Sequence, residues 1–309
     1  LVGSEMCIRD RYQNVPLITK VMTMDEANAA EPATAGQILD FIISECAAIA
    51  GKLPVSYANM PGAEKGHATR ATALALKARA ALYAASPLYN TSNDNSKWVA
   101  AAEAAYEIIG QKSELGVDLD ASFSNLFGAT NYNSKEVILV RATGTSSSFE
   151  SANFPKGVTG GNTTTCPTEN LASAFEMNNG TAFDWNNAAM RANPYKDRDP
   201  RFYLTIVHNG MAWPSTKAVE IWEGGANGLP LTNATTTGYY LRKYVDKSIT
   251  FDAGSASAST NHNWILFRYA EVLLNYAEAM VNAYGDINRT TANCAMSALE
   301  AVNAVRGRT

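Results

Sequence analysis

Residues able to carry catalysis or to bind a metal are few in this sequence, and they are scattered. The three histidines stand in unrelated contexts without an attendant nucleophile. Sequence motifs for a serine-hydrolase elbow, a phosphate-binding loop, a dinucleotide-binding turn and a zinc-protease helix are absent. The cysteines form no CxxC pair and have no histidine at metal-ligand spacing. We therefore expect structural or solvent-facing roles for His67, His208 and His262, no zinc site at Cys7, Cys46, Cys166 or Cys294, and no cofactor.

Two carboxylates, Glu271 and Glu278, are the remaining candidates for acid–base chemistry. Seven helical residues separate their backbones by about 10.5 Å, which exceeds the separation that either glycosidase geometry usually requires. We interpret them instead as partners of neighbouring helix ends or of Arg268. The sequence thus predicts a protein that is not an enzyme.

Binding a sugar requires less, because a sugar presents apolar C–H faces and a ring of hydroxyls. Its site combines an aromatic ring with polar side chains at the edge. Residues 118–262 contain both, since aromatic residues stand there among many asparagines in loop-like segments. The candidate ligand-binding residues are Trp185, Trp213, Phe149 and Phe154. For each ring, the alternative is that it packs this region onto the rest of the protein.

Composition indicates a globular protein, because 46% of the 309 residues are hydrophobic and 17% are charged. This length allows one large core or two modest ones. A net charge of -4 without a cluster of lysines and arginines argues against a nucleic-acid partner. No apolar run approaches the roughly 18 residues that a membrane-spanning helix requires.

Apolar residues at spacings of three and four predict the helices that must position these residues. The clearest helix is expected over residues 264–285, with a mate over 290–306. A helix starting at Thr34 is predicted by its capping-box pattern with Gln37, and further helices are expected over 68–85 and 97–111. Short strands are expected over 136–141 and 205–208. We predict a mainly α fold in which tetratricopeptide-like helical hairpins (34–112 and 263–307) carry a long loop-rich insertion (118–262) with short strands.

Residues 268–279 read RYAEVLLNYAEA. This segment closely resembles the signature helix of the SusD/RagB family of nutrient-binding outer-membrane lipoproteins. Further matches in the same order as in the family are VPL at 15–17, LKAR at 76–79, ASPLYN at 85–90, PTENL at 167–171, DPRF at 199–202 and YYLRK at 239–243. These motifs are distributed along most of the chain, and together they make the resemblance specific.

The resemblance implies a tetratricopeptide-type scaffold whose insertion carries the ligand site. It implies binding of glycans at the cell surface, attachment to the outer membrane through a lipid anchor, and a SusC-like TonB-dependent transporter as partner. A peptide remains an alternative to a glycan as the ligand. A tetratricopeptide-type protein-interaction module and, less favoured, a glycoside hydrolase are the competing functions.

The first residues, LVGSEMCIRD, fit neither the periodicity nor the composition of the rest of the chain. The same string is encoded by a transposon adapter used to prepare sequencing libraries. We interpret residues 1–11 as adapter-derived and residues 12–309 as a single SusD-like domain from within a longer protein, whose signal peptide and lipidation site would lie outside this fragment.

Overall fold

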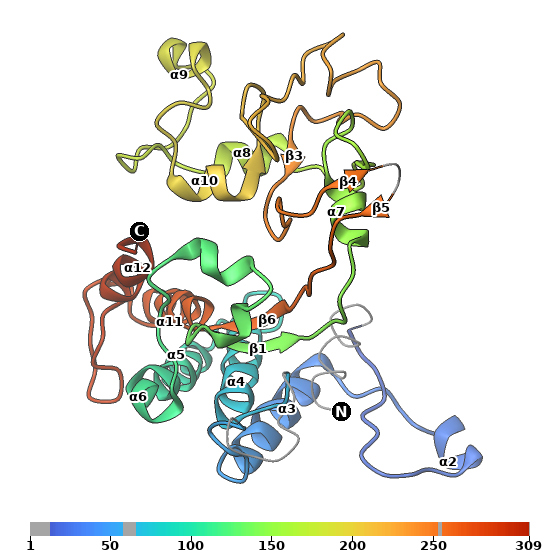
Figure 1. Ribbon diagram of the computed structural model, residues 1–309. Coiled ribbons are helices and arrows are strands. Elements are labelled where there is room, and N and C mark those ends of the chain that lie inside the picture. Colours follow the sequence, from blue (N-terminus) through green and yellow to red (C-terminus); the bar gives the residue numbers. More distant parts are fainter. Residues whose placement is uncertain (1–12, 58–65, 253–254, 309) are drawn as a thin grey trace. The chain divides into compact units, whose positions relative to one another are not determined.

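The computed structural model describes residues 13–57, 66–252 and 255–308. Its chain divides into two compact units, each considered by itself below (Figure 1). The helical unit contains residues 13–121, Tyr132–Arg141 and Ile265–Arg308, and the loop unit contains Ser122–Asn131 and Ala142–Trp264. The predicted insertion thus corresponds to most of the loop unit, although Tyr132–Arg141 belongs to the helical unit. The interpretation of residues 1–11 as adapter sequence concerns residues outside the described ones.

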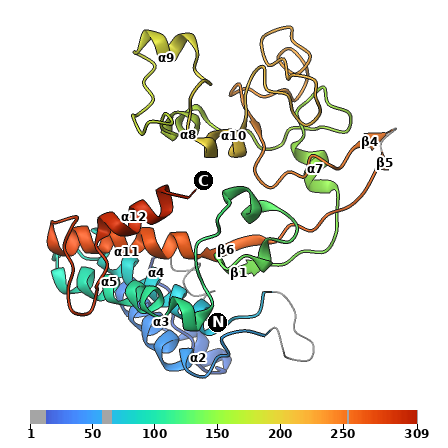
Figure 2. The same ribbon diagram turned by 60° about the vertical axis from the view of Figure 1, so that its left-hand side comes forward.

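The helical unit is a row of packed helices. Along the row, α3 packs on α4, α4 on α5, α5 on α11 and α11 on α12, so helices far apart in the sequence become neighbours (Figures 1 and 2). This arrangement confirms the predicted mainly α fold with helical hairpins. The helices of the unit are α2 (Met24–Asn28), α3 (Ala35–Ala50), α4 (Arg70–Ala85), α5 (Asn95–Gly110), α6 (Lys112–Leu115), α11 (Tyr269–Tyr284) and α12 (Ala298–Arg306).

Local sequence signals set the helix ends. Thr34 caps α3, and its capping box with Gln37 is present as expected. Helix α5 is capped by Asp94, whose carboxylate accepts from the Ser96 N–H at 2.9 Å. Gly285 ends α11 in the left-handed conformation, at φ 68°. The interior of α4 is mostly alanine, which allows α3 and α5 to pack closely against it.

The prediction of a helix over 264–285 is wrong for its first five residues. Trp264–Arg268 forms strand β6, which pairs with β1 (Val137–Arg141), and α11 begins only at Tyr269. The aromatic and β-branched run WILF fits a strand better than a helix start. On α11 the side chains of Tyr276 and Met280 are buried, whereas those of Leu274 and Val281 are exposed.

The predicted mate of that helix is shorter than expected, because residues 290–297 are not helical. Thr291 and Cys294 form a turn in which the Cys294 N–H donates to the Thr291 hydroxyl at 3.0 Å. Helix α12 begins at Ala298, behind a capping box made by Ser297 and Glu300. Threonine and asparagine side chains compete for backbone hydrogen bonds and so disfavour a helix interior, which accounts for the late start.

A buried carboxylate, that of Glu136, links segments of the helical unit that are distant in the sequence. The side chain is fully buried and pairs with Arg268 at 2.7 Å and with Arg308. Its Oε2 also accepts from the Asp120 N–H at 3.0 Å. The carbonyl of Glu136 accepts from the Tyr269 N–H at 2.8 Å, at the first residue of α11. Glu136 therefore fixes the start of β1 against the end of β6 and against the chain beyond α12.

The loop unit has little regular structure. Its two antiparallel strand pairs are β2 (Ile206–Val207) with β3 (Tyr240–Leu241) and β4 (Phe251–Asp252) with β5 (Ser255–Ala256). Strands thus occur at both places where the sequence predicts them, as β1 and β2. The short helices are η1 (Phe123–Phe127), η2 (Asn131–Asn133, which continues into the helical unit), α7 (Ser148–Asn153), α8 (Glu169–Ala174), α9 (Ala188–Ala192) and α10 (Pro200–Thr205).

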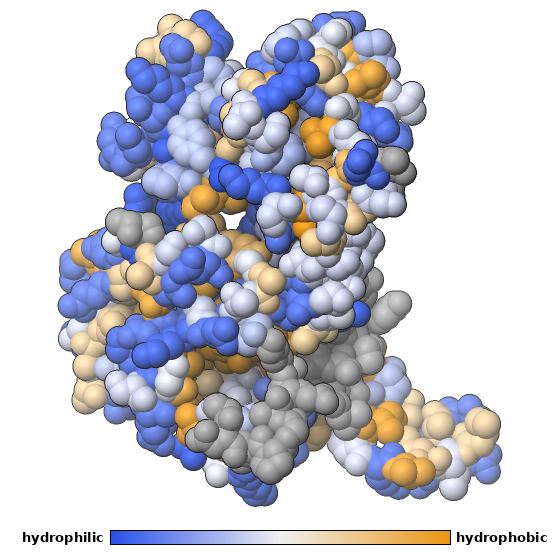
Figure 3. All heavy atoms as spheres, in the orientation of Figure 1, coloured by the Kyte–Doolittle hydropathy of each residue, from blue (hydrophilic) through white to orange (hydrophobic). Residues whose placement is uncertain are grey.

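Hydrophobic side chains are exposed on the segment that carries α2. Val21 is 99% and Met24 is 76% exposed, and Figure 3 shows the corresponding hydrophobic patches on this segment.

None of the helices in the described parts of the chain combines the length and the apolar character needed to cross a bilayer.

We expect the substitution Glu136→Gln to lower the free energy of unfolding by about 3–5 kcal/mol, because it removes the buried carboxylate that pairs with Arg268 and Arg308. Chemical denaturation measures this change. The matched control is Glu278→Gln on the exposed face of α11, where a change within about 0.5 kcal/mol is expected. Equal effects of the two substitutions would contradict the role assigned to Glu136.

Candidate functional site

Trp213 lies in the loop of residues 211–219, which follows β2. The Val219 N–H donates to the Met211 carbonyl at 2.9 Å, and Ala212 and Ala218 form an antiparallel bridge, so the loop is closed at its base. The indole of Trp213 is only 3% exposed and packs edge-on against Phe154, with ring centroids 5.6 Å apart. Both rings belong to one hydrophobic cluster with Val207, Val219 and Tyr240. Trp213 is therefore held rigidly.

Two cavities of the loop unit meet at Trp213. Cavity A has a volume of about 310 Å³ and cavity B about 410 Å³, and Trp213 and Lys247 line both. Phe154 and Phe251 add aromatic surface to cavity B, whose polar lining includes Thr159, Ser215, Asn227 and Thr250. An aromatic surface bordered by hydroxyl and amide groups is the lining expected of a sugar site.

Cavity A has a different aromatic lining, formed by Phe127 and Tyr244. These two rings lie edge to face at 5.0 Å, and Tyr244 also contacts Trp264 at 4.8 Å. Tyr244 adopts φ 68°, a left-handed conformation that is costly for an aromatic residue and marks a position fixed by its surroundings. The ammonium of Lys243 lies 4.2 Å from the centroid of the Phe127 ring.

A third cavity, C, has a volume of about 520 Å³ and borders cavity B, with which it shares Gly157, Val158, Thr159 and Phe251. At Gly160 the glycine is required, because a Cβ would meet the Phe251 ring at 2.4 Å. Phe251, which lines both cavities, therefore lies close against the backbone of Gly160.

The cations at these cavities have few acidic partners. An Arg242 Nη1–H donates to the carbonyl of Tyr203, and burial lowers the pKa of Arg242 below its usual value. Lys217 and Lys247 are exposed, and neither ammonium group forms an ion pair with a described residue. The lining thus combines aromatic rings, hydroxyl groups and positive charge.

Of the four residues predicted from the sequence, the structure brings two together. Trp213 and Phe154 (2% exposed) contact each other and line cavity B, although they are buried and not on exposed loops as expected. Trp185 and Phe149 line none of the three cavities. Whether any of the four contacts a ligand stays a prediction.

Trp185 is 39% exposed and is oriented by Glu169, the first residue of α8. Its indole N–H donates to the Glu169 carboxylate at 2.9 Å. Hydroxyls of Ser173 and Tyr239 donate to the same carboxylate, at 2.7 and 2.8 Å. Burial alone would raise the pKa of Glu169, but these hydrogen bonds outweigh it and lower the pKa below the usual value. The arrangement holds an exposed indole in one orientation.

Phe149 lies on α7, partly buried between the rings of His262, at 4.6 Å, and Trp264, at 5.1 Å. His262 lines cavity A, and its Nε2 lies 3.0 Å from Oε1 of the fully buried Glu150. Phe149 therefore contacts His262, a lining residue of cavity A, without lining the cavity itself.

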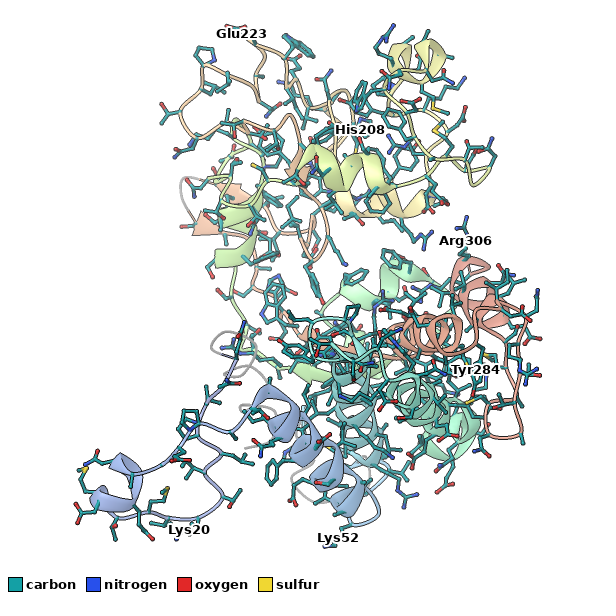
Figure 4. All side chains as sticks on the ribbon, turned by 180° about the vertical axis from the view of Figure 1, so that it is seen from behind. Lys20, Lys52, His208, Glu223, Tyr284 and Arg306 are labelled. Carbon is teal, nitrogen blue, oxygen red and sulfur yellow. The ribbon has the colours of Figure 1, made fainter. Side chains whose placement is uncertain are left out.

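The remaining candidates have structural surroundings. Glu271 forms an ion pair with Arg79, at 2.6 Å, and not with Arg268, while Glu278 is exposed. His208 stacks on Tyr195 at 4.3 Å, and burial lowers its pKa; in Figure 4 it lies among the side chains of the loop unit, whereas Glu223 points outward. Within the described residues, no group of three or more His, Cys, Asp or Glu side chains is placed to hold a metal ion.

Sequence reasoning missed the cations and three of the rings at the cavities, those of Phe127, Tyr244 and Phe251. Arg242, Lys243 and Tyr244 lie within or next to the segment YYLRK, which served only as a family motif. The mixture of basic and aromatic residues there was a usable signal. Nothing in the sequence indicated that residues 124–129 would contribute to the same cavity.

Alanine substitutions at Trp213 and Trp185 should affect stability differently. Trp213→Ala should lower the free energy of unfolding by about 3–5 kcal/mol, because it removes a buried ring and leaves a void. Trp185→Ala should cost clearly less, since that ring is already 39% exposed. Denaturant titrations of both variants measure the difference, and a larger loss at Trp185 would contradict the packing described.

A pH dependence is expected from Glu169. Because its pKa is lowered in the folded state, the carboxylate stabilises the fold above its unfolded-state pKa, and this contribution is lost as the pH falls through the folded-state value. Glu169→Gln should therefore destabilise the protein at neutral pH by about 1–3 kcal/mol, and the difference from the unmodified chain should shrink in acid. Melting curves from pH 7 down to about pH 3 test this; a difference that does not change with pH would contradict it.

Comparison with known proteins shows what the chain is similar to. A SusD-like carbohydrate-binding protein from Bacteroides fragilis superposes with a TM-score of 0.77 at 25% identity, over 99% of this chain and 57% of that one. Another SusD-like protein from Bacteroides fragilis gives 0.74 at 27% identity, over 99% and 59%. A surface glycan-binding protein A from Bacteroides uniformis gives 0.63 at 20% identity, over 99% and 56%, which shows a shared fold alone.

The chain thus spans less than two thirds of the length of these structures. No curated protein matches it. The model of the SusD family matches residues 131–309, which is more than half of the chain and includes nearly all of the loop unit together with α11 and α12. The chain therefore belongs to the SusD family.

Proposed function

We propose that this chain binds glycans through the cavities of its loop unit and does not chemically alter them. The observation that carries the proposal is the position of Trp213, a rigidly held indole at the junction of two cavities whose linings also supply hydroxyl and amide groups. Stacking on an aromatic ring suits the apolar face of a sugar, and the surrounding polar groups suit its hydroxyls. Membership of the SusD family and the likeness to a protein described as carbohydrate-binding support this function.

The proposal extends to the cellular setting. Bound glycan would be delivered to a SusC-like TonB-dependent transporter, with the protein held at the surface of the outer membrane by a lipid anchor. Family membership is the support for this part of the proposal. Its test is purification of the complete protein from its own membranes: a TonB-dependent transporter should co-purify with it, and purification without one would contradict the partnership.

Catalysis is the competing function to be tested. The two glutamates considered for catalysis lie on α11. Glu271 forms an ion pair with Arg79, and Glu278 is exposed. A binding protein should leave its glycan intact. Release of reducing sugar from a bound polysaccharide by the purified protein would overturn the non-catalytic proposal.

Binding should be sensitive to the shape of the ring at position 213. The variant Trp213→Phe keeps the position apolar and shortens the stacking surface. We expect it to weaken glycan binding, by less than the about 5- to 150-fold that complete loss of roughly 1–3 kcal/mol of stacking would cause. Calorimetry against a panel of neutral and acidic polysaccharides measures the change.

The matched control is Trp98→Phe, since Trp98 is 6% exposed in the core of the helical unit. Both variants remove a similar amount of buried surface, so they should lose similar stability, but Trp98→Phe should bind glycan as the unmodified chain does. The same comparison with Trp185→Ala tests the second predicted ring. Unchanged affinity in Trp213→Phe would place the site elsewhere.

A further inference from the structure

We propose that the glycan recognised by this chain is anionic, carrying carboxylate or sulfate groups that pair with a basic rim around the cavities. The inference rests on the proposed glycan binding and specifies the class of sugar. The basic rim consists of the lysine and arginine residues that line cavities A, B and C, namely Lys156, Lys217, Arg242, Lys243 and Lys247.

The charge at the three cavities is opposite in sign to that of the whole chain. The chain has 25 lysines and arginines against 29 aspartates and glutamates. Among the described residues that line the cavities, the five members of the basic rim face a single carboxylate, that of Asp246. Oδ1 of Asp246 already accepts from the N–H and the hydroxyl of Ser248, at 2.9 and 2.6 Å. A local excess of positive charge in an acidic protein attracts anions.

Three cations of the basic rim form no ion pair with a described residue. Lys217 and Lys247 are exposed, and Arg242 donates to the neutral carbonyl of Tyr203. Positive charges without nearby counter-charges attract a bound anion. A neutral sugar would gain nothing from them.

The geometry also combines the two kinds of recognition. Trp213 and Lys247 both line cavity A and cavity B. A sugar that enters either cavity therefore meets both residues. Lys217 adds a second cation to cavity B, whose described lining contains no carboxylate. This pairing of an aromatic surface with lysines matches a sugar that has one apolar face and a charged substituent.

The test uses pairs of glycans that differ only in charge. Oligogalacturonate is compared with the same material after its carboxyl groups have been reduced, and dextran sulfate is compared with dextran. The acidic member of at least one pair should bind at least about tenfold more tightly, as two ion pairs of ordinary strength allow. The affinity should fall as salt is raised above roughly 0.1 M, where screening becomes short-ranged. The pair that responds identifies carboxylate or sulfate as the recognised group.

Variants connect the preference to the basic rim. The double substitution Lys217→Gln with Lys247→Gln should weaken binding of the acidic glycan about tenfold and leave binding of its neutral counterpart nearly unchanged. The control is Lys196→Gln, because Lys196 is an exposed lysine of the same unit that lines none of the three cavities. It should bind the acidic glycan as the unmodified chain does.

The outcomes separate this inference from the function on which it rests. Binding of neutral glycans alone, or equal losses in the double variant and in Lys196→Gln, would overturn the anionic preference while leaving glycan binding intact. Failure to bind any neutral or acidic glycan would overturn both.

Discussion

The buried carboxylate of Glu136 is the interaction on which the arrangement of this chain depends. It lies at the start of β1, from which the chain enters the long segment of residues 142–263, and it pairs with Arg268 at the end of β6, where the chain returns. Pairing of β1 with β6 then fixes both ends of that segment. The entropic cost of bringing the two ends of a loop together rises only slowly with the length of the loop. One closure by β1 and β6 is therefore enough to hold a very long inserted segment. The helices need no continuity in sequence to pack as a row.

Within the loop unit, buried side chains form the hydrogen bonds to the backbone that helices and strands provide elsewhere. The hydroxyl of Tyr240 donates to the Asn227 carbonyl, and the Asn227 amide donates to the Lys156 carbonyl at 2.7 Å. Arg198 donates to the carbonyls of Phe175 and Pro194, each at 2.8 Å, and its guanidinium lies 4.0 Å from the centroid of the Phe183 ring. Such contacts satisfy backbone groups that strands would otherwise pair. The cavities consequently have fixed walls although few of their residues belong to helices or strands.

The same buried contacts explain what the sequence could and could not predict. Periodicity and caps located the helices that begin at Ala35, Arg70 and Asn95, because these signals are local. The run WILF was assigned to the wrong element, since its pairing with β1 is set by residues more than a hundred positions away. Trp213 looked exposed because its neighbours are loop-like, whereas distant residues such as Phe154 bury it.

The candidate site was predicted only in part for the same reason. Its residues come from separated irregular segments, so neither spacing nor periodicity brings them together. Phe154 and Trp213 were recognisable as aromatic residues among asparagines, but the basic rim becomes visible only once the chain is folded. By contrast, the segment DPRF has a role that is local, because Asp199 precedes a proline at a helix start and accepts from the Arg201 N–H at 2.8 Å.

Fluorine NMR of the chain labelled with 5-fluorotryptophan tests most directly whether the cavities at Trp213 bind glycan. The five tryptophans give five signals, which single Trp→Phe substitutions assign. On titration with a bound glycan, the Trp213 signal should shift in a saturable way while that of Trp98, in the core of the helical unit, should not. If glycan binding shifts other tryptophan signals in a saturable way but leaves that of Trp213 unchanged, the glycan does not bind at the cavities around Trp213.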